Sequence, residues 1–305
     1  MKGLELSRAF YEECGKPMLE RDFPALLPYL AAGLFGSGSE CFGYDDEVSR
    51  DHDFEPGFCI FLPGEDVIDR RGEFLLERAY AKLPKEFRGI SREILLPVGG
   101  NRHGVLRTGE FFRRTVGSPD GRLTAEQWLT LPEQALAEAA NGAVFFDEYG
   151  EVTRIRGALR YFPEDVRRKR LAGQLLLMGQ AGQYNFTRCL THGERAAARL
   201  AAHEFVRAAL SALFLLERRY QPYYKWSFRA LRELPQASSL AQPLETLLTG
   251  GGVEEIERIS AAVATMVRTQ QLSDVPDDEL ERHAYAVNDR IRDASIRNLH
   301  ILATV

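Results

Sequence analysis

The distribution of glycine and proline constrains the fold of this chain more than any other feature. Up to about residue 160, short apolar runs alternate with turns rich in these two residues, as in domains that mix strands and helices. After residues 161–163, glycine and proline become sparser and long helical periods follow. We therefore expect an α+β fold in two domains: residues 1–160 form a mixed-sheet domain, and residues 161–305 form a C-terminal helical bundle.

Within the first domain, apolar runs predict buried strands at residues 57–62, 94–98, 105–107 and 143–147, and a strand or short helix at 26–35. Residues 152–159 are expected to pair with 143–147 as a hairpin. Helical spacing predicts helices at residues 4–19, 65–85 and 125–140. The predicted buried side of the 65–85 helix consists of Val67, Phe74, Leu75, Ala79 and Leu83.

The second domain is expected to contain helices at residues 166–178, 194–219, 225–234, 253–267 and 278–303. The basic run at residues 167–170 follows two acidic residues. We interpret it as a solvated helix face, in preference to a site for RNA or another anion.

Composition excludes several classes of protein. A net charge of −5 over 305 residues gives no basic excess, so nucleic acid is an unlikely partner, whereas small nucleotides and metals remain compatible. The four cysteines form no Cys-x-x-Cys pair, which argues against a zinc site or a disulfide framework. No segment has the length of a signal peptide core or a membrane span, so we expect a cytoplasmic protein without membrane contact.

The candidate site begins at residues 36–40, with the sequence GSGSE, and continues at Asp51 and Asp53. The glycines allow the backbone to approach a ligand closely, and Ser39 can cap a following helical turn. In an extended segment, Asp51 and Asp53 face one side and His52 faces the other. Two carboxylates that face the same way repel each other unless a cation lies between them, and such oxygen ligands suit Mg²⁺.

The order Gly38-Ser39, Ser49 and Asp51-x-Asp53 resembles the signature of the nucleotidyltransferase (polymerase β-like) superfamily. Within it, the chain resembles the antibiotic nucleotidyltransferases and a family of uncharacterised bacterial proteins, DUF4037. The resemblance to DUF4037 covers most of the chain through WLTLPEQ at residues 128–134, GQYN at 182–185 and YQPYYKW at 220–226. One departure is Arg50, which separates Ser49 from Asp51 where the superfamily usually has serine and aspartate adjacent.

The resemblance implies a third carboxylate from a later strand, either to complete the metal site or to take a proton from the acceptor. Asp147 is the candidate because it ends a predicted buried strand, although it also suits the first position of a turn. Glu110 and Glu148 are the substitutes.

The resemblance also implies a lysine from the helical region that contacts the triphosphate. Lys225, which is flanked by aromatic residues, fits this role. The alternative interpretation is that Lys225 is a surface lysine whose aliphatic stem is buried and whose ammonium group is in water. Tyr184, Asn185 and Arg188 could line the same cleft, but packing and capping also explain them.

The function implied is transfer of a nucleoside monophosphate, with AMP from ATP as the expected group, to a hydroxyl of an acceptor that the sequence does not identify. Mg²⁺ and a nucleoside triphosphate would be required. A second hypothesis is a regulatory module that binds a nucleotide without transfer, and a third is an enzyme that modifies RNA or protein. The sequence does not indicate the nucleobase preference or the oligomeric state.

Overall fold

The computed structural model describes residues 1–47, 55–92 and 103–304. The chain divides into two compact units. The sheet unit consists of Met1–Leu123 and Ala135–Arg160, and the helical unit consists of Thr124–Gln134 and Tyr161–Val305.

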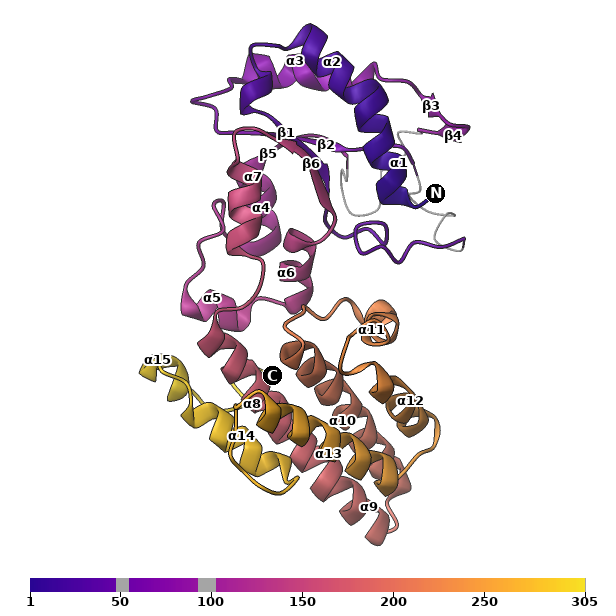
Figure 1. Ribbon diagram of the computed structural model, residues 1–305, viewed down its shortest axis with the longest axis vertical. Helices are drawn as coiled ribbons and strands as arrows, with labels where there is room; N and C mark the ends of the chain where they lie inside the picture. The colour runs from indigo at the N-terminus through magenta and orange to yellow at the C-terminus, as the bar shows by residue number, and fades with distance from the viewer. Residues whose placement is uncertain (48–54, 93–102, 305) are drawn as a thin grey trace. The chain divides into compact units, whose positions relative to one another are not determined.

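A four-stranded mixed sheet, in the order β5-β2-β1-β6, forms the centre of the sheet unit (Figure 1). Its strands are β1 (Ala31–Leu34), β2 (Cys59–Leu62), β5 (Gly104–Arg107) and β6 (Ala143–Asp147). β1 is antiparallel to β2 and β6, and β2 is parallel to β5. Gly33 lies opposite Cys59, while Ala31 lies opposite Phe61 and Asp147. β1 therefore ends where β2, β5 and β6 begin; we call this the Gly33 end of the sheet and the other the Asp147 end.

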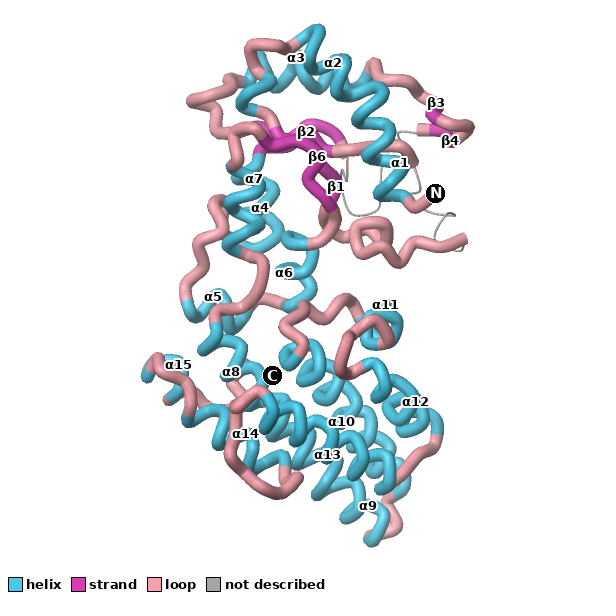
Figure 2. Tube along the Cα trace, viewed as in Figure 1, coloured by secondary structure: helices cyan, strands magenta, loops and turns pink. Residues whose placement is uncertain are grey.

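Helices cover both faces of this sheet (Figure 2). One face carries α1 (Gly3–Phe10), a π-helical turn (Tyr11–Gly15), α2 (Lys16–Asp22) and α3 (Arg70–Ala81). The other carries α4 (Thr108–Val116), α6 (Glu133–Ala140) and α7 (Glu151–Ala158). Because neighbouring strand residues face opposite ways, Ile60 packs in the core with Phe10 and Leu76, whereas Phe61 stacks on Phe35 and meets Phe111 edge-on. The shorter elements are a 3₁₀ turn (Leu27–Tyr29) and the small hairpin of β3 (Glu86–Phe87) and β4 (Ile90–Ser91).

The helical unit is built around α8 (Glu164–Met178), which packs against α10 (Arg195–Leu216) and α14 (Leu280–Asp289). Its other helices are α5 (Ala125–Thr130), a π-helical segment (Gly179–Phe186), α9 (Thr187–Thr191), α11 (Tyr224–Leu231), a 3₁₀ turn (Ser238–Leu240), α12 (Ala241–Thr249), α13 (Val253–Thr269) and α15 (Ala294–Arg297). The π-helical segment continues α8 without a turn between them. No helix in the part of the chain described here is long and apolar enough to cross a membrane.

The predicted α+β class is confirmed, with a mixed sheet in the N-terminal part and helices in the C-terminal part. The strands predicted at residues 57–62, 105–107 and 143–147 are present as β2, β5 and β6, and the leading helix is present as α1 and α2. The strand predicted at 94–98 lies outside the described residues.

Two predicted helices are each divided in the structure. Residues 125–140 form α5 and α6, which are separated at Leu131 and Pro132 because a residue before proline disfavours the helical conformation. Residues 278–303 break after α14, where the Asp165 carboxylate accepts hydrogen bonds from the N–H groups of Arg292 and Asp293. Asp293 then caps α15 through the N–H of Ser295.

The hairpin predicted for residues 152–159 is wrong, because this segment is helix α7. Its buried apolar residues, Val152, Ile155 and Leu159, are three and four positions apart, which is helical spacing. The helix starts after Gly150, whose φ of 75° turns the chain away from β6. Residues 151–158 therefore cover the sheet and do not extend it.

The predicted buried side of α3 is largely wrong. Phe74 and Leu75 are 55% and 44% exposed, whereas Leu76 and Tyr80 are buried. Tyr80 fixes this orientation because its hydroxyl donates a hydrogen bond of 2.7 Å to the Phe58 carbonyl and accepts one of 3.1 Å from the Phe58 N–H.

The basic run at residues 167–170 is not a solvated face, since Arg167, Lys169 and Arg170 are buried. Arg167 pairs with Glu164, whereas Lys169 and Arg170 donate mainly to carbonyl oxygens. Lys169 Nζ donates to the carbonyls of Arg297 and Leu299, at 3.2 and 2.6 Å, and Arg170 donates to three carbonyls of the 128–131 segment. The run therefore holds other segments of the helical unit around α8.

Candidate functional site

The GSGSE turn leaves β1 at the Gly33 end of the sheet, and Asn141 fixes its first residue. The Gly36 N–H donates to Asn141 Oδ1 at 2.9 Å, and Asn141 Nδ2 donates to the Gly36 carbonyl at 2.7 Å. Gly36 has a φ of 129°, which a residue with a side chain rarely adopts. Sequence analysis did not identify Asn141, although the Asn-Gly pair at 141–142 is a turn signal between α6 and β6.

Two glycines let β1 and β6 approach each other closely beside this turn. A Cβ atom on Gly142 would lie 2.1 Å from the Leu34 carbonyl oxygen, and one on Gly33 would lie 2.6 Å from the Ala143 carbonyl oxygen. Gly142 also has a φ of 58° and donates its N–H to the Cys41 carbonyl at 2.8 Å. The position of the turn therefore depends on contacts that only glycine permits.

Three successive N–H groups of the turn have no acceptor in the described residues. Those of Ser37, Gly38 and Ser39 donate no hydrogen bond there, whereas the N–H groups of residues 41–44 bond to the carbonyls of residues 38–40. Gly38 is buried and Ser39 is partly buried. Consecutive free N–H groups in a tight turn form a concave site that suits an anion.

A cavity of about 250 Å³ opens beside the turn. It is lined by residues 36–38 of the turn and by residues of α4 and α6, among them Arg114, Thr115 and Glu138. Arg114 is exposed on α4, one turn after Phe111, which packs on Phe35 and Phe61 and so fixes that helix to the sheet. The cavity therefore brings together one guanidinium, one carboxylate and two residues, Ser37 and Gly38, whose N–H groups have no acceptor among the described residues. Neither Arg114 nor Glu138 was predicted as a site residue.

Arg156 supports the turn from α7. Its guanidinium lies 4.6 Å from the centre of the Phe35 ring and donates to the carbonyls of Ala139 and Ala140 at the end of α6, at 3.3 and 2.9 Å. Burial lowers its pKa, but a guanidinium stays charged at neutral pH. Arg156 thus joins α6, which carries Glu138, to the residue that precedes Gly36.

The two predicted metal ligands, Asp51 and Asp53, lie outside the described residues, as do Ser49, Arg50 and His52. The chain becomes described again at Glu55, whose Oε1 is 3.2 Å from Nδ1 of His103, the residue before β5. A Cβ atom on Gly57 would lie 2.4 Å from that histidine nitrogen, so glycine is needed here as well. Residues 55–58 therefore lead into β2 at the Gly33 end, the end that carries the GSGSE turn.

Asp147 lies at the other end of the sheet, opposite Ala31. Its Oδ1 accepts the Gly150 N–H at 2.9 Å, and its Oδ2 accepts the Thr153 N–H at 2.7 Å, which caps the start of α7. Burial raises the pKa of the nearby Glu151, and the negative charges of Asp147 and Asp66 raise it further. The structure thus does not bring Asp147 to the turn that contains Gly38.

The two substitutes for Asp147 lie near the same end. Glu110 is exposed in the first turn of α4, directly after β5, and Glu148 is exposed in the turn after β6. In the described ranges, no three His, Cys, Asp or Glu side chains are grouped so that they could hold a metal ion.

Lys225 and Arg188 both belong to the helical unit and are exposed. Lys225 Nζ lies 4.9 Å from the centre of the Trp226 ring, and Arg188 donates to the Tyr184 hydroxyl at 3.0 Å. The GQYN motif also has packing roles. A Cβ atom on Gly182 would lie 2.3 Å from the Phe205 ring, and Gln183 accepts the Leu280 N–H at 2.9 Å at the start of α14.

Two of the three motifs shared with DUF4037 meet in one partly buried cluster of the helical unit. Glu133 Oε1, from WLTLPEQ, accepts the backbone N–H of Gln221, from YQPYYKW, at 2.7 Å. Burial raises the pKa of Glu133 to about 7, against the opposing effects of the Gln221 N–H and the Arg170 guanidinium. Burial likewise raises the pKa values of the neighbouring Tyr161 and Tyr220. These contacts give both motifs a structural role.

Comparison with known proteins supports part of the resemblance. The family model described as "Domain of unknown function (DUF4037)" matches residues 128–227. This range contains all three motifs on which the resemblance to DUF4037 was based, so that resemblance is confirmed here. No curated protein matches the chain. Among solved structures, the crystal structure of a nucleotidyltransferase-like protein from Exiguobacterium sibiricum 255-15 is similar to 90% of this chain and 80% of its own, with 12% sequence identity and a TM-score of 0.36.

Proposed function

We propose that this protein is a Mg²⁺-dependent nucleotidyltransferase that transfers a nucleoside monophosphate, AMP from ATP, to a hydroxyl group of an acceptor molecule. The observation that carries this proposal is the cavity of about 250 Å³ beside the GSGSE turn, which residues with free N–H groups and Arg114 line together. Backbone N–H groups and guanidinium groups are strong donors to phosphate oxygens. The cavity is small for a whole nucleotide and suits a phosphate chain.

In this proposal, the turn residues Gly38, Ser39 and Glu40, together with Arg114, hold the phosphates. Asp51 and Asp53 bind the metal in this proposal, which for them rests on the Asp51-x-Asp53 pattern of the sequence. A bound Mg²⁺ neutralises charge on the phosphates and orients the attacking oxygen. The free N–H groups are held in place before the nucleotide binds, because Asn141 fixes Gly36.

The third carboxylate has two candidates. Asp147 follows from the resemblance, but both of its oxygens accept N–H groups that cap α7. Glu138 lines the cavity itself. We therefore propose Glu138 ahead of Asp147 as the carboxylate that accepts the proton of the acceptor hydroxyl.

Lys225 and Arg188 are proposed as further phosphate contacts on the basis of the resemblance alone. If Lys225 binds the triphosphate, Lys225→Gln weakens ATP binding and Lys225→Arg restores most of it, because arginine keeps the charge. Equal affinity of all three proteins would remove Lys225 from the site. Arg188→Gln provides the same test for Arg188.

A regulatory module that binds a nucleotide without transfer is the second candidate function. The capping role of Asp147 favours it, since this role leaves the resemblance without its expected third carboxylate at the turn. Arg50, between Ser49 and Asp51, is the other departure from the superfamily signature.

Two measurements test the proposal. Binding of ATP by calorimetry is compared between the wild type, Arg114→Gln and Arg113→Gln, a matched control on the same helix that does not line the cavity. We expect only Arg114→Gln to weaken binding, by about tenfold or more, because a charged hydrogen bond contributes about 1.5–3 kcal/mol. Release of pyrophosphate from ATP, with a mixture of small hydroxyl-bearing acceptors, then distinguishes transfer from binding alone. Equal weakening by both variants would contradict the assigned site.

A further inference from the structure

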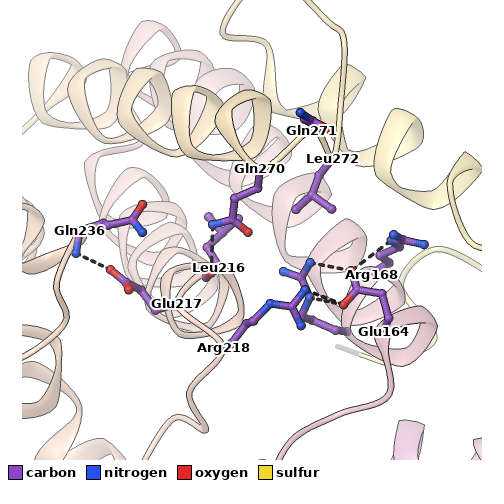
Figure 3. Close-up of a pocket in the computed structure, with 10 residues that line it drawn as sticks. Glu164, Arg168, Leu216, Glu217, Arg218, Gln236, Gln270, Gln271 and Leu272 are labelled. Atoms are coloured by element: carbon purple, nitrogen blue, oxygen red, sulfur yellow. Dashed lines mark hydrogen bonds and ion pairs between the residues drawn. The ribbon is translucent and has the colours of Figure 1, made fainter.

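A second and larger cavity, of about 760 Å³, lies within the helical unit (Figure 3). It is open to solvent and is bordered by the start of α8, the end of α10, the end of α13 and Gln236. Its lining is mostly polar, with three arginines, three glutamines and two glutamates, and with Leu216 and Leu272 as the apolar residues. The volume is within the range of sites for small molecules.

Two helices end at this cavity with a non-glycine residue in an unfavourable backbone conformation. Arg218 after α10 and Gln271 after α13 have φ values of 54° and 56°, in the left-handed region. Both ends have the hydrogen bond that closes such a helix terminus, from Arg219 N to Phe214 O and from Leu272 N to Val267 O, each 3.0 Å long. Glycine is the preferred residue at this position because a Cβ atom is unfavourable there. Among the described residues, the other non-glycine residue with positive φ is Arg88, in the sheet unit.

Long polar side chains thus occupy two positions where glycine would be more favourable, and both line one cavity. Unfavourable backbone conformations of this kind concentrate at functional sites.

The cavity also has an excess of positive charge around one carboxylate. Glu164 accepts hydrogen bonds from Arg167 and Arg218, at 2.7 and 2.8 Å, and Arg168 Nε lies 3.3 Å from it. Burial raises the pKa of Glu164, but the hydrogen bonds and charges of the arginines outweigh burial and lower it. The second carboxylate, Glu217, is engaged by the N–H groups of Gln236 and Ala237, at 2.6 and 2.9 Å.

Arg218 is the guanidinium best placed to bind a ligand. Its side chain is 55% exposed, whereas that of Arg167 is buried and also donates to the Leu215 carbonyl. Figure 3 shows Arg218 extending from the end of α10 toward Glu164, with Gln236 and Gln270 on other sides of the cavity. Rotation of Arg218 away from Glu164 leaves that carboxylate still bonded to Arg167 through both of its oxygens.

We propose that this cavity is a second ligand site, which binds a small molecule carrying a phosphate monoester through Arg218 and hydrogen-bonds the polar remainder of that molecule through glutamine amides. A phosphate monoester has a charge of about −1.5 to −2 at pH 7, so it competes for Arg218 better than the single charge of Glu164. The volume exceeds the need of a phosphate ion, and amides donate and accept hydrogen bonds to hydroxyl groups. The site is independent of the nucleotide site proposed in the sheet unit.

The test is the thermal unfolding of the full chain with ribose 5-phosphate, with ribose as the uncharged control and inorganic phosphate as the minimal anion, at constant ionic strength. We expect ribose 5-phosphate at ten times its Kd to raise the Tm by about 3 °C, inorganic phosphate to have a smaller effect and ribose to have none. Arg218→Gly and Gln271→Gly place the preferred residue at each helix end. Both variants are therefore expected to fold with a Tm close to the wild-type value. Arg218→Gly should lose the response to both phosphate compounds, whereas Gln271→Gly should lower the response to ribose 5-phosphate and keep the response to inorganic phosphate.

Two controls make the result specific. Arg88→Gly makes the same backbone change outside the helical unit, and Arg114→Gln changes the proposed nucleotide site; both variants should keep the full response to ribose 5-phosphate. The proposal would be overturned if neither phosphate compound stabilises the wild type, or if Arg218→Gly responds as the wild type does. Loss of the response in Arg114→Gln alone would assign the phosphate to the sheet unit and equally overturn it.

Discussion

The side-chain amide of Asn141 forms two hydrogen bonds with the backbone of Gly36, a residue 105 positions earlier in the chain, at 2.9 and 2.7 Å. This pairing fixes the GSGSE turn to the segment between α6 and β6. The position of the turn therefore depends on the segment after β1 and on the segment before β6.

Asn141→Ala should lower the free energy of unfolding by about 1–3 kcal/mol, because it leaves two partly buried backbone groups of Gly36 without partners. ATP affinity should fall as well, since the turn is no longer fixed. Chemical denaturation and calorimetry measure the two effects. Asn141→Asp keeps the acceptor and loses the donor, so it should lie between the wild type and Asn141→Ala. Unchanged ATP affinity in a folded Asn141→Ala protein would contradict the role of the turn.

Gly142→Ala should be strongly destabilising, because its Cβ would lie 2.1 Å from the Leu34 carbonyl oxygen. The control is Gly117→Ala, where φ is also positive but nothing lies within 4 Å of the added atom. The control should lose only the roughly 1–2 kcal/mol of the left-handed conformation. Similar loss of stability in both variants would mean that β1 and β6 can separate without much cost.

The stability of the protein should depend on the protonation of Glu133. Burial raises its pKa to about 7 in the folded protein, compared with the ordinary glutamate value of 4.5. The folded state therefore binds this proton more tightly, and the resulting stabilisation is complete below about pH 4.5 and is lost as the pH rises through 7. The loss between pH 5 and 8 should be up to about 3 kcal/mol.

Glu133→Gln should remove this part of the pH dependence, because glutamine keeps the acceptor for the Gln221 N–H and does not titrate. Urea denaturation of both proteins at pH 5 and pH 8 measures it. The difference between the proteins isolates Glu133 from His283, whose pKa burial lowers. A parallel pH dependence in the two proteins would show that Glu133 titrates normally.

Much of this fold could be predicted from local sequence patterns. The strands β2, β5 and β6 are apolar runs bounded by turn residues, and the change in glycine and proline content near residue 160 indicates where helices take over. Residues 152–159 were misassigned as a strand because the start of helix α7 depends on a capping contact with the Asp147 carboxylate, which the local sequence pattern does not show. The burial of Arg167, Lys169 and Arg170 could not be predicted, since their carbonyl partners come from distant segments.

Only the part of the candidate site that consists of consecutive residues could be predicted from the sequence. The GSGSE turn is visible because glycine and serine restrict what that stretch can be. Asn141, Arg114 and Glu138 approach it through tertiary packing of α4, α6 and β6, which has no local signature. Asp147 was selected because it ends a predicted strand. The direction of that strand in the sheet decides whether its last residue lies near the turn, and β6 runs away from the turn.

Glu138→Gln and Asp147→Asn should have different effects. If Glu138 accepts the proton of the acceptor hydroxyl, Glu138→Gln lowers the transfer rate by about 10²-fold or more and leaves ATP binding nearly unchanged. Asp147→Asn weakens the cap of α7, so it should lower stability by about 1 kcal/mol with little effect on transfer. Rate measurements and denaturation curves on both variants decide the matter, and the reverse pattern would make Asp147 the third carboxylate.

The most direct measurement is calorimetric titration of ATP into the wild type and the double variant Asp51→Asn/Asp53→Asn, with and without Mg²⁺, with GTP, CTP and UTP as comparisons. The proposed function predicts ATP binding that requires Mg²⁺ and is lost in the double variant, while the double variant keeps the wild-type Tm. Absence of binding by every nucleotide, or binding that neither Mg²⁺ nor the two aspartates affect, would contradict it.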